Sequence, residues 1–261
     1  MFTDHLNREM NVPKFPQRIV SICPAITETL HALGAGSAVV GRTKYCIFPE
    51  KEVEKISVVG GTKDADPEKV RALSPDLILA EKEENTKENV ETLEQIAPVA
   101  VLEVQTVSDS YRLIRDVGRL IGRVEAAEAL VNEIQQAWNA LPQVVGQRAV
   151  YMMWRKPYMV VGDTTYIQSV MDHLGIENTA KHLEGRYPAI TPELLKELDP
   201  DVVLLSSEPF PFSEKHQREL AEFLPDTPSI LVEGEMFWYG SKMKDAAAYL
   251  SKLAVQMKQF E

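Results

Sequence analysis

DADPEKVRALSPDLILAEKEE, residues 64–84, and YPAITPELLKELDPDVVLLSSEPF, residues 187–210, are the two stretches that decide the fold of this chain. They match at one constant spacing, the 125 residues that separate Glu68 from Glu193. The matched pairs are Pro67 and Pro192, Glu68 and Glu193, Leu73 and Leu198, and the dipeptides Pro75-Asp76 and Pro200-Asp201. Each copy predicts a short helix opened by proline, a Pro-Asp turn and a buried strand. The predicted strands are residues 77–80 and 202–205.

The recurrence indicates two lobes of similar build. A helix, a turn and a strand in succession are common in α/β proteins, and this alone would account for the apolar positions. It does not easily account for a Pro-Glu pair at the start of both helices. We therefore predict an α/β protein with an N-terminal lobe over residues 1–107 and a C-terminal lobe over residues 146–261.

Between the lobes, residues 108–145 are predicted to be a bridging helical segment. Over residues 108–141 apolar side chains recur every three or four positions, with charged residues between them, which is typical of an amphipathic helix. Ser108 is a candidate N-cap, because its hydroxyl can accept a bond from a first-turn N–H. Gly122 is expected to divide the run into two helices, of which Val124 to Leu141 is the longer.

The two ends of the chain have simpler patterns. Residues 1–17 are predicted to form an arm that leads into a first strand over residues 18–22. A helix is expected over residues 24–33, and a final amphipathic helix over residues 242–260. No apolar stretch or cleavage site of an export signal is recognisable in residues 1–17. This leaves open a cytosolic protein and a mature form whose leader has been removed.

Composition limits the classes of function. With 261 residues, of which 44% are hydrophobic, the chain is long enough for two cores. A net charge of −11 makes an extended phosphate backbone an unfavourable partner. The two cysteines, Cys23 and Cys46, are too few for a disulfide framework and are interpreted as free thiols, with a single bridge as the alternative. No apolar run approaches the roughly 20 residues of a membrane span.

Several polar residues of the first lobe follow predicted strands, where parallel α/β sheets bind ligands. The loop Gly60-Gly61-Thr62-Lys63 follows one such strand, and Glu81 and Lys82 follow another. The acidic run from Glu81 to Glu84 is interpreted as the solvated start of a helix, since carboxylates favour the positive helix end. A ligand role for Glu81 and Lys82 depends only on their place after a strand.

The second lobe carries large aromatic residues in predicted loops, which is typical of proteins that hold a flat, bulky ligand. Ordinary core packing is the alternative for Trp154. The residues singled out are Trp154 and Arg155 after a strand, Gly162 and Asp163 before a helix, Tyr187, Glu208, and Trp238 and Tyr239 in EMFWYGS.

No enzyme motif is recognisable. The histidines His5, His31, His173, His182 and His216 form no metal-ligand pattern, and neither a nucleophile elbow nor a Walker loop is present. We therefore predict no catalytic residues, no metal ligands and no intrinsic cofactor. Under the alternative hypothesis that the protein is an enzyme, Asp163 with Glu208 is the one candidate titratable pair.

Four stretches carry a resemblance to a known family: RIVSICPAITETLHALGAG, GGTKDADPEKVRALSPDLILA, the central helical segment, and TPELLKELDPDVVLLS. Together they resemble the substrate-binding proteins of ABC importers for cobalamin, haem and ferric siderophores, the class with a helical backbone between its lobes. The likeness covers nearly the whole chain from Arg18 and is greatest to cobalamin-binding members. It implies two lobes with mostly parallel sheets, joined by one long helix, with a ligand cleft between them.

The resemblance also implies roles for particular residues. Glu68 and Glu193 match the glutamates with which family members dock on arginines of the membrane permease. Thr62, Glu81, Tyr187 and the loop 235–239 match ligand positions, and Thr62 and Glu81 depart from the aromatic residues of cobalamin binders. The complete predicted ligand set is Cys23, Pro24, Tyr45, Gly61, Thr62, Lys63, Glu81, Lys82, Trp154, Arg155, Gly162, Asp163, Tyr187, Glu208, Trp238 and Tyr239.

The resemblance therefore implies a monomeric, non-enzymatic binding component of an ABC importer, working outside the cytoplasm. Its cargo would be a small metal chelate or corrinoid containing cobalt or iron, with no nucleic acid partner and no membrane-spanning segment. Lys44, Lys63, Lys82 and Arg155 could attract an anionic siderophore. The alternative is a cytosolic carrier, sensor or cofactor-handling enzyme of the same fold, which the missing leader favours.

Overall fold

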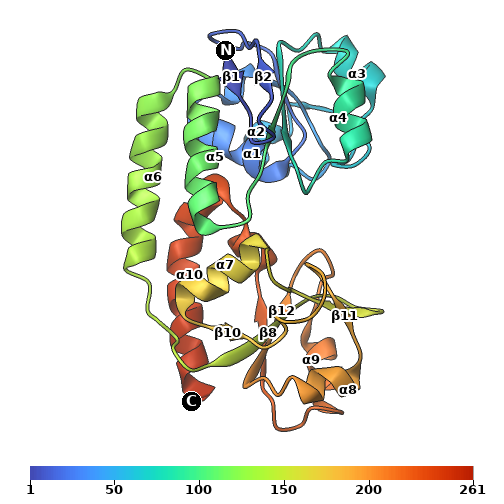
Figure 1. The fold of residues 1–261 in the computed structure, drawn as a ribbon, viewed down its shortest axis with the longest axis vertical. Helices are drawn as coiled ribbons and strands as arrows, with labels where there is room; N and C mark the ends of the chain where they lie inside the picture. The colour runs from blue at the N-terminus through green and yellow to red at the C-terminus, as the bar shows by residue number, and fades with distance from the viewer. Residues whose placement is uncertain (261) are drawn as a thin grey trace. The chain divides into compact units, whose positions relative to one another are not determined.

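The computed structural model describes residues 1–260, so that Glu261, the end of the predicted second lobe, lies outside it (Figure 1). The chain forms two compact units. Unit 1 comprises Met1–Val104, Ser108–Glu133 and Tyr239–Lys242, and unit 2 comprises Gln105–Val107, Ile134–Trp238 and Met243–Glu261. Within the described part of the chain, no helix has both the length and the apolar character that a membrane crossing needs.

Unit 1 is built on a five-stranded parallel sheet with the order β5-β4-β3-β6-β7. The strands are β3 (Ile19–Ser21), β4 (Val39–Arg42), β5 (Ser57–Val58), β6 (Leu77–Glu81) and β7 (Val99–Leu102). Strands β3 and β6 and the edge strand β7 are buried along their whole length. This explains why their sequences are continuously apolar instead of alternating.

Helices cover both faces of this sheet, as Figure 1 shows. They are α1 (Pro24–Ala32), α2 (Glu50–Val53), α3 (Pro67–Ala72), α4 (Lys87–Leu93) and η1 (Gly36–Ala38), a short 3-10 turn. On the α3 and α4 face, Val70 and Leu93 pack against side chains of β3, β6 and β7 in one apolar cluster. The predicted helix over residues 24–33 is confirmed, and Gly34 follows it in the left-handed region with φ +75°.

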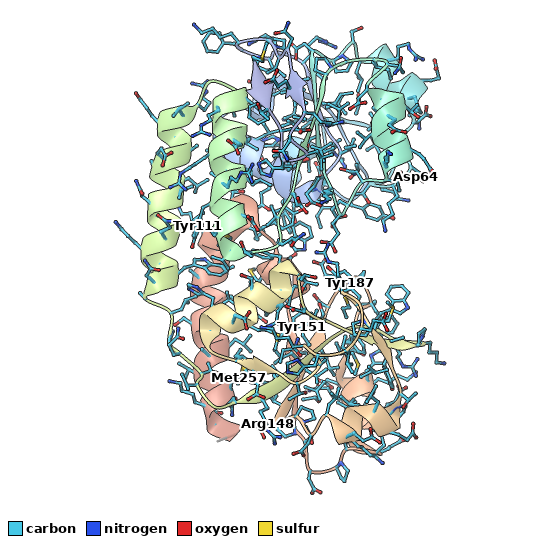
Figure 2. The ribbon with its side chains drawn as sticks, viewed as in Figure 1. Asp64, Tyr111, Arg148, Tyr151, Tyr187 and Met257 are labelled. Atoms are coloured by element: carbon cyan, nitrogen blue, oxygen red, sulfur yellow. The ribbon has the colours of Figure 1, made fainter. Side chains whose placement is uncertain are left out.

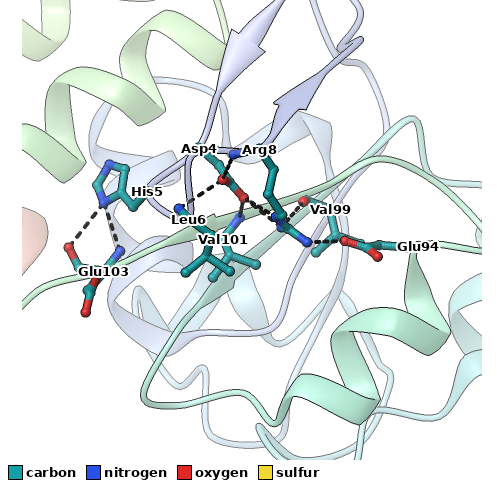
Figure 3. A network of polar contacts seen from close by, with 8 residues as sticks. All are labelled: Asp4, His5, Leu6, Arg8, Glu94, Val99, Val101 and Glu103. Carbon is teal, nitrogen blue, oxygen red and sulfur yellow. Dashed lines mark hydrogen bonds and ion pairs between the residues drawn. The ribbon is translucent and has the colours of Figure 1, made fainter.

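The first residues form a hairpin instead of the predicted arm, with β1 (Phe2–Thr3) antiparallel to β2 (Glu9–Met10). Figure 3 shows how its turn is held. The buried Asp4 carboxylate accepts hydrogen bonds from the backbone N–H groups of Leu6, Arg8 and Val101, and pairs with the Arg8 guanidinium. Burial alone would raise the pKa of Asp4, but the bonds from Arg8 hold it below its usual value. The prediction missed this hairpin because its partners are about a hundred residues away.

His5, in the same turn, connects the hairpin to two other elements of unit 1. His5 Nδ1 lies 2.9 Å from the backbone nitrogen and 3.2 Å from the carbonyl oxygen of Glu103, and Nε2 lies 3.0 Å from Asp116 Oδ2. The His5 backbone N–H donates to the carbonyl of Val101 at 3.1 Å. The hairpin therefore covers the outer edge of β7, which would otherwise be open to pairing with another strand.

The central segment consists of two helices, α5 (Val107–Leu120) and α6 (Val124–Asn139). The predicted break at Gly122 is confirmed, since this residue has φ +68° and ends the first helix. The predicted N-cap at Ser108 is wrong: α5 already begins at Val107, whose N–H donates to Ser169 Oγ at 3.0 Å. Helix α6 contributes its first part to unit 1 and its last part, from Ile134, to unit 2.

Unit 2 contains a sheet with the order β11-β9-β8-β12-β13, and β10 pairs with β8 in addition. The strands are β8 (Arg148–Trp154), β9 (Tyr158–Val160), β10 (Glu177–Asn178), β11 (Ala189–Ile190), β12 (Val202–Ser206) and β13 (Ser229–Val232). Strands β8, β10, β12 and β13 are parallel, as predicted, whereas β9 pairs antiparallel with β8, and β11 pairs antiparallel with β9. The chain turns back after β8, so this sheet contains a hairpin, β8 with β9, that the five-stranded sheet of unit 1 does not have.

The helices of unit 2 again lie on both sides of the sheet (Figure 1). They are α7 (Tyr166–Leu174), α8 (Pro192–Glu197), α9 (Glu214–Ala221), α10 (Met243–Met257), and the 3-10 turns η2 (Gly234–Phe237) and η4 (Lys258–Phe260). Leu195 of α8 and Leu220 of α9 pack against Val150, Val203 and Leu205 of the sheet. The final predicted helix is thus confirmed as α10, with one 3-10 turn at each end.

One short stretch from late in the chain belongs to unit 1. Tyr239–Lys242, which includes η3 (Gly240–Lys242), packs on α1 and α5. The backbone N–H of Gly240 donates to Ser110 Oγ at 2.7 Å, and that of Ser241 donates to Thr29 Oγ1 at 3.1 Å. Lys242 forms a buried ion pair with Glu28 at 3.0 Å. We call these four residues the crossing segment.

The predicted repeat is confirmed in detail. Helices α3 and α8 both begin at the matched prolines, and the residues that follow them, Ser74 and Asp199, both have φ +45°. The matched aspartates also have the same partner, the arginine that opens the unit's first parallel strand. Asp76 accepts from the backbone N–H of Arg18 at 3.0 Å, and Asp201 accepts from that of Arg148 at 2.8 Å. Arg148 is labelled in Figure 2.

Candidate functional site

The predicted ligand residues of unit 1 follow its parallel strands. Cys23 comes after β3, Tyr45 after β4, Gly61, Thr62 and Lys63 after β5, and Glu81 and Lys82 lie at the end of β6. Because the carboxyl ends of parallel strands meet at one edge of the sheet, the structure brings these loops together, at the edge where α/β sheets bind ligands.

Glu81 is the centre of this edge. The interpretation of Glu81 as part of a solvated helix start is wrong, because it is the last residue of β6, only 1% exposed, and α4 begins at Lys87. Its Oε2 accepts from the N–H groups of Glu83 at 2.8 Å and Glu84 at 3.0 Å, and its Oε1 from that of Val104 at 3.2 Å. Burial nevertheless raises the pKa of Glu81 to about 7.

Asn85 was missed by sequence reasoning and is buried beside Glu81. Its Oδ1 accepts from the Glu81 N–H at 2.8 Å, and its Nδ2 donates to the carbonyls of Ile22 at 3.0 Å and Thr62 at 2.6 Å. The side chain thus connects the segments after β3, β5 and β6. An amide after a buried strand, in an otherwise charged run, was the available sequence signal.

The Cys23 thiol lies 3.3 Å from the Tyr239 hydroxyl, and both belong to unit 1. Burial raises the pKa of both groups, and the nearby Glu81 and Glu84 carboxylates raise them further. Cys23 and Cys46 are free, as predicted. Pro24, also in the predicted set, is the first residue of α1.

The remaining predicted residues of unit 1 differ in exposure and in partners. Tyr45 and Lys63 are exposed, whereas Gly61 and Thr62 are buried. A Cβ on Gly61 would lie 2.2 Å from Asp64 Oδ1, which accepts the Gly61 N–H, so a larger residue there would displace this carboxylate. Lys82 is paired with Glu103 at 2.7 Å and therefore offers less positive charge than its place after a strand suggested.

Unit 2 places an aromatic cluster at the end of β8 and after β12. Trp154, which is 39% exposed, meets the Phe210 ring at a centroid distance of 6.0 Å. Phe210 in turn contacts Phe212 at 4.8 Å and His216 at 5.1 Å. Trp154 is in the predicted ligand set, whereas Phe210, Phe212 and His216 are not, although Phe210 and Phe212 flank a proline after a buried strand. Arg155, beside Trp154, pairs with Glu219 of α9 at 2.7 Å.

Glu208 and Trp238 are brought together in unit 2, where Trp238 Nε1 donates to Glu208 Oε1. Ser206 supports this loop, because its hydroxyl accepts from Tyr151 at 3.0 Å and donates to the Glu208 carbonyl at 2.6 Å. A Cβ on Gly234 would lie 2.4 Å from Glu208 Cγ. Glycine at that position therefore leaves the space in which Glu208 reaches Trp238.

Gly162, Asp163 and Tyr187 lie in neighbouring loops of unit 2. The Gly162 N–H donates to the Arg186 carbonyl at 2.8 Å, and a Cβ on Gly162 would lie 2.5 Å from the Gly185 carbonyl oxygen. Gly162 thus permits close approach of the loop that carries the half-buried Tyr187. Asp163 is exposed, and its Oδ1 accepts from the Thr164 N–H at 2.8 Å.

Glu68 and Glu193 both lie in the first turn of an exposed helix end. Glu68 is 80% exposed and pairs with Arg71 on its own helix. For Glu193, hydrogen bonds from its own backbone N–H and from the Thr191 hydroxyl lower the pKa, so this carboxylate is charged over a wide pH range.

Among the described residues, no group of three or more His, Cys, Asp or Glu side chains is arranged to hold a metal ion. Asp163 and Glu208, the nominated titratable pair, each bind another group: a backbone N–H for Asp163 and the Trp238 indole for Glu208. What the geometry offers is a set of ordered loops at two sheet edges, suited to recognition.

Residues 19–230 match the family model described as periplasmic binding protein. The chain belongs to this family. Its members are binding proteins, in agreement with a chain in which no catalytic motif is recognisable.

Curated relatives include the uncharacterized ABC transporter substrate-binding lipoprotein YvrC of Bacillus subtilis, 29% identical over 77% of this chain and 67% of its own length. The vitamin B12-binding protein of Pectobacterium carotovorum is 25% identical over 74% of this chain and 72% of its own length. The first of these relatives is named for an ABC transporter and the second for binding vitamin B12, so the alternative of a cytosolic carrier, sensor or enzyme is not favoured.

Solved structures show the same fold at low sequence identity. The periplasmic heme-binding protein HutB of Vibrio cholerae superposes with a TM-score of 0.78 at 21% identity, covering 91% of this chain and 98% of that one. The petrobactin-binding protein YclQ of Bacillus subtilis gives a TM-score of 0.75 at 16% identity, covering 94% and 93%. The predicted fold class, with mostly parallel central sheets in two α/β lobes, is confirmed.

Proposed function

We propose that this protein is the substrate-binding component of an ABC importer and that its cargo is a cobalt- or iron-bearing macrocycle or chelate. The observation that carries the proposal is the family match from residue 19 to residue 230. Relatives named for vitamin B12 support a corrinoid as the first ligand to test. Haem and a ferric siderophore follow, because solved proteins of the same fold are named for them.

The loops at the strand ends support a recognition role. In unit 2, the exposed ring of Trp154 and the neighbouring Phe210 offer the flat apolar surface that a conjugated macrocycle packs against. Glu208, two residues before Phe210, holds Trp238, so this indole is oriented before a ligand arrives. In unit 1, the loops after β3, β5 and β6 are ordered by buried hydrogen bonds. Preorganisation of this kind lowers the entropic cost of binding.

The proposal includes delivery to a membrane permease through Glu68 and Glu193. Both carboxylates lie at matched positions on exposed helix starts, and complementary charges at two separate points fix the orientation of a bound protein. The protein would act as a monomer outside the cytoplasm, as the family resemblance implies.

The test is a titration of the purified protein with cyanocobalamin, haem and ferric siderophores, followed by tryptophan fluorescence and by the melting temperature. A ligand that binds only the folded state raises the melting temperature with concentration. We expect saturable binding of one class, weakened at least tenfold in Trp238→Ala and Tyr187→Ala. Lys252→Ala, a change on the exposed side of α10, is the control and leaves the affinity unchanged. Absence of binding by all three classes would contradict the proposal.

The docking contacts are tested separately from the cargo. Glu68→Gln with Glu193→Gln should leave ligand affinity unchanged and abolish stimulation of the importer's ATPase activity in proteoliposomes. Full stimulation by the double variant would show that other residues dock.

A further inference from the structure

Two buried polar side chains of unit 1 hold the ligand-side loops without being exposed to a ligand themselves. Glu81 is 1% exposed, and Asn85 is also buried. Their hydrogen bonds reach the N–H groups of Glu83, Glu84 and Val104 and the carbonyls of Ile22 and Thr62. The Glu81 N–H itself is bound by Asn85 Oδ1. We call this group of bonds the clamp.

We infer that Glu81 and Asn85 are positioning residues, which hold the loops after β3, β5, β6 and β7 in one arrangement that ligand binding by unit 1 requires. This inference rests on the proposed function. It states that the arrangement of the ligand-side loops of unit 1 depends on two residues that the ligand does not touch. The segments concerned follow four strands of one sheet edge. Each of them contributes a backbone group to the clamp.

The charge of Glu81 matters to the clamp because a carboxylate is acceptor-only. Ionised, its two oxygens accept all three N–H groups. Protonated, one oxygen carries a hydrogen and accepts more weakly, and the Val104 bond, the longest at 3.2 Å, is the one most easily weakened. A weakened bond to a buried N–H is costly, so protonation loosens the segment after β7. Ligand affinity should therefore fall as the pH decreases.

The titratable and charged groups near Glu81 do not remove this expectation. They are Glu83, Glu84, Lys63, Cys23, Tyr239 and the Lys82–Glu103 pair. Burial raises the pKa of Cys23 and of Tyr239, so both stay neutral below pH 8. Burial and the charge of Glu83 also raise the pKa of Glu84, while Lys63 opposes them. The effect of Glu84 titration on affinity can be distinguished from that of Glu81, because Glu84 is still present in a Glu81→Gln variant.

The test begins without a ligand, by hydrogen–deuterium exchange of the full chain followed by mass spectrometry. Asn85→Ala removes all three bonds of the amide, and Asn85→Asp keeps the acceptor for the Glu81 N–H while removing the donors to Ile22 and Thr62. We expect exchange at least tenfold faster in peptides covering residues 60–65 and 82–85 for both variants. Glu88→Gln on the exposed start of α4 is the control and leaves exchange unchanged. Unchanged exchange over residues 60–65 in a folded Asn85→Asp variant would overturn the clamp.

The second arm measures affinity at pH 5.5 and pH 8 with whichever of cyanocobalamin, haem or ferric siderophore binds. The natural protein and Glu88→Gln should bind about tenfold more weakly at pH 5.5, which is the scale of one lost buried hydrogen bond. Glu81→Gln mimics the protonated carboxyl, so its affinity should equal the low-pH value at both pH values. A pH dependence that persists in Glu81→Gln would overturn the role of Glu81. If no ligand binds, the proposed function fails, and the exchange experiment still decides whether the clamp exists.

Discussion

The ends of β6 in unit 1 and β12 in unit 2 are matched positions of the repeat, but different side chains order the loops that follow them. Glu81 of unit 1 corresponds to Ser206 of unit 2, and Asn85 corresponds to Phe210. Unit 1 uses a carboxylate and an amide, which bind backbone groups of neighbouring segments. Unit 2 uses a hydroxyl that binds Tyr151, and an aromatic cluster.

The difference shows which part of the architecture is shared and which part is free to change. Both units have the same proline-opened helix, the same φ +45° residue after it, and the same arginine–aspartate contact at the base of the sheet. These features fix the backbone path up to the strand end. Beyond it, ordering by buried charge makes a loop sensitive to pH, whereas the contacts of Phe210 with Trp154 and Phe212 involve no titratable group.

The largest effect that would sharpen this contrast is the pH dependence of stability from Glu81. Its pKa is raised to about 7 in the folded protein, against 4.5 for an ordinary glutamate. Between pH 4.5 and 7 the folded state therefore holds more protons than the unfolded state, so the free energy of unfolding decreases as pH rises. The loss is roughly 3 kcal/mol across this window. Urea unfolding at pH 5 and 7.5 should show this slope in the natural protein and lose it in Glu81→Gln; parallel slopes would contradict it.

The counterpart in unit 2 is Phe210, and its removal should cost less. Phe210→Ala deletes a half-buried ring that contacts Trp154, Phe212 and His216. We expect a loss of about 2 kcal/mol in the free energy of unfolding, with no change of its pH slope between pH 4.5 and 7. Phe210→Leu is the matched control, since it keeps apolar volume and should recover about half of the loss. A new pH dependence in Phe210→Ala would remove the distinction between the two units.

The shared arginine–aspartate contact should respond equally in both units. Asp76→Asn and Asp201→Asn each leave one acceptor oxygen where two are used, for the N–H groups of Gln17 and Arg18 or for two groups of Arg148. A loss of about 1 kcal/mol is expected for each, and the double variant should show the sum. Chemical unfolding measures all three. A cost in one unit more than twice that in the other would break the equivalence.

The smallest effect concerns Arg71, whose counterpart is Lys196. Arg71 pairs with Glu68 on an exposed surface, whereas Lys196 acts on Glu193 only through its charge. Arg71→Lys gives the first helix the same Glu and Lys spacing as the second and should change stability by less than about 0.5 kcal/mol. Thermal melting at low and at high salt checks this. A loss above 1 kcal/mol would mean that the pair has a structural role.

The sequence contained enough information for the framework because its signals are local or repeated. The Pro-Glu starts, the Pro-Asp turns and the continuous apolar strands recur at one spacing, which identified α3, α8, β6 and β12. The hydrophobic period with Gly122 identified α5 and α6. Cysteine count and spacing correctly indicated free thiols.

The site was less predictable because its contacts join residues far apart in the chain. Glu81 stands in an acidic run and was taken for a solvated residue, but its carboxylate is bound by N–H groups of a turn and of Val104. Asn85 reaches back to Ile22, and nothing local marks that contact. For unit 2, Trp154 was recognisable as a loop aromatic, whereas its partner Phe210 lies 56 residues later. A ligand contact at Trp154 stays a prediction until a ligand is bound.

The crossing segment has a consequence for the order in which the protein becomes complete during synthesis. Unit 1 draws its first 104 residues from the start of the chain but also needs Tyr239–Lys242, which bind Cys23, Ser110, Thr29 and Glu28. When only residues 1–133 have been synthesised, the α1 surface of unit 1 therefore still lacks those partners. Domains usually fold one after the other as they emerge. Here the first unit can reach its final packing only after nearly all of the second has been translated.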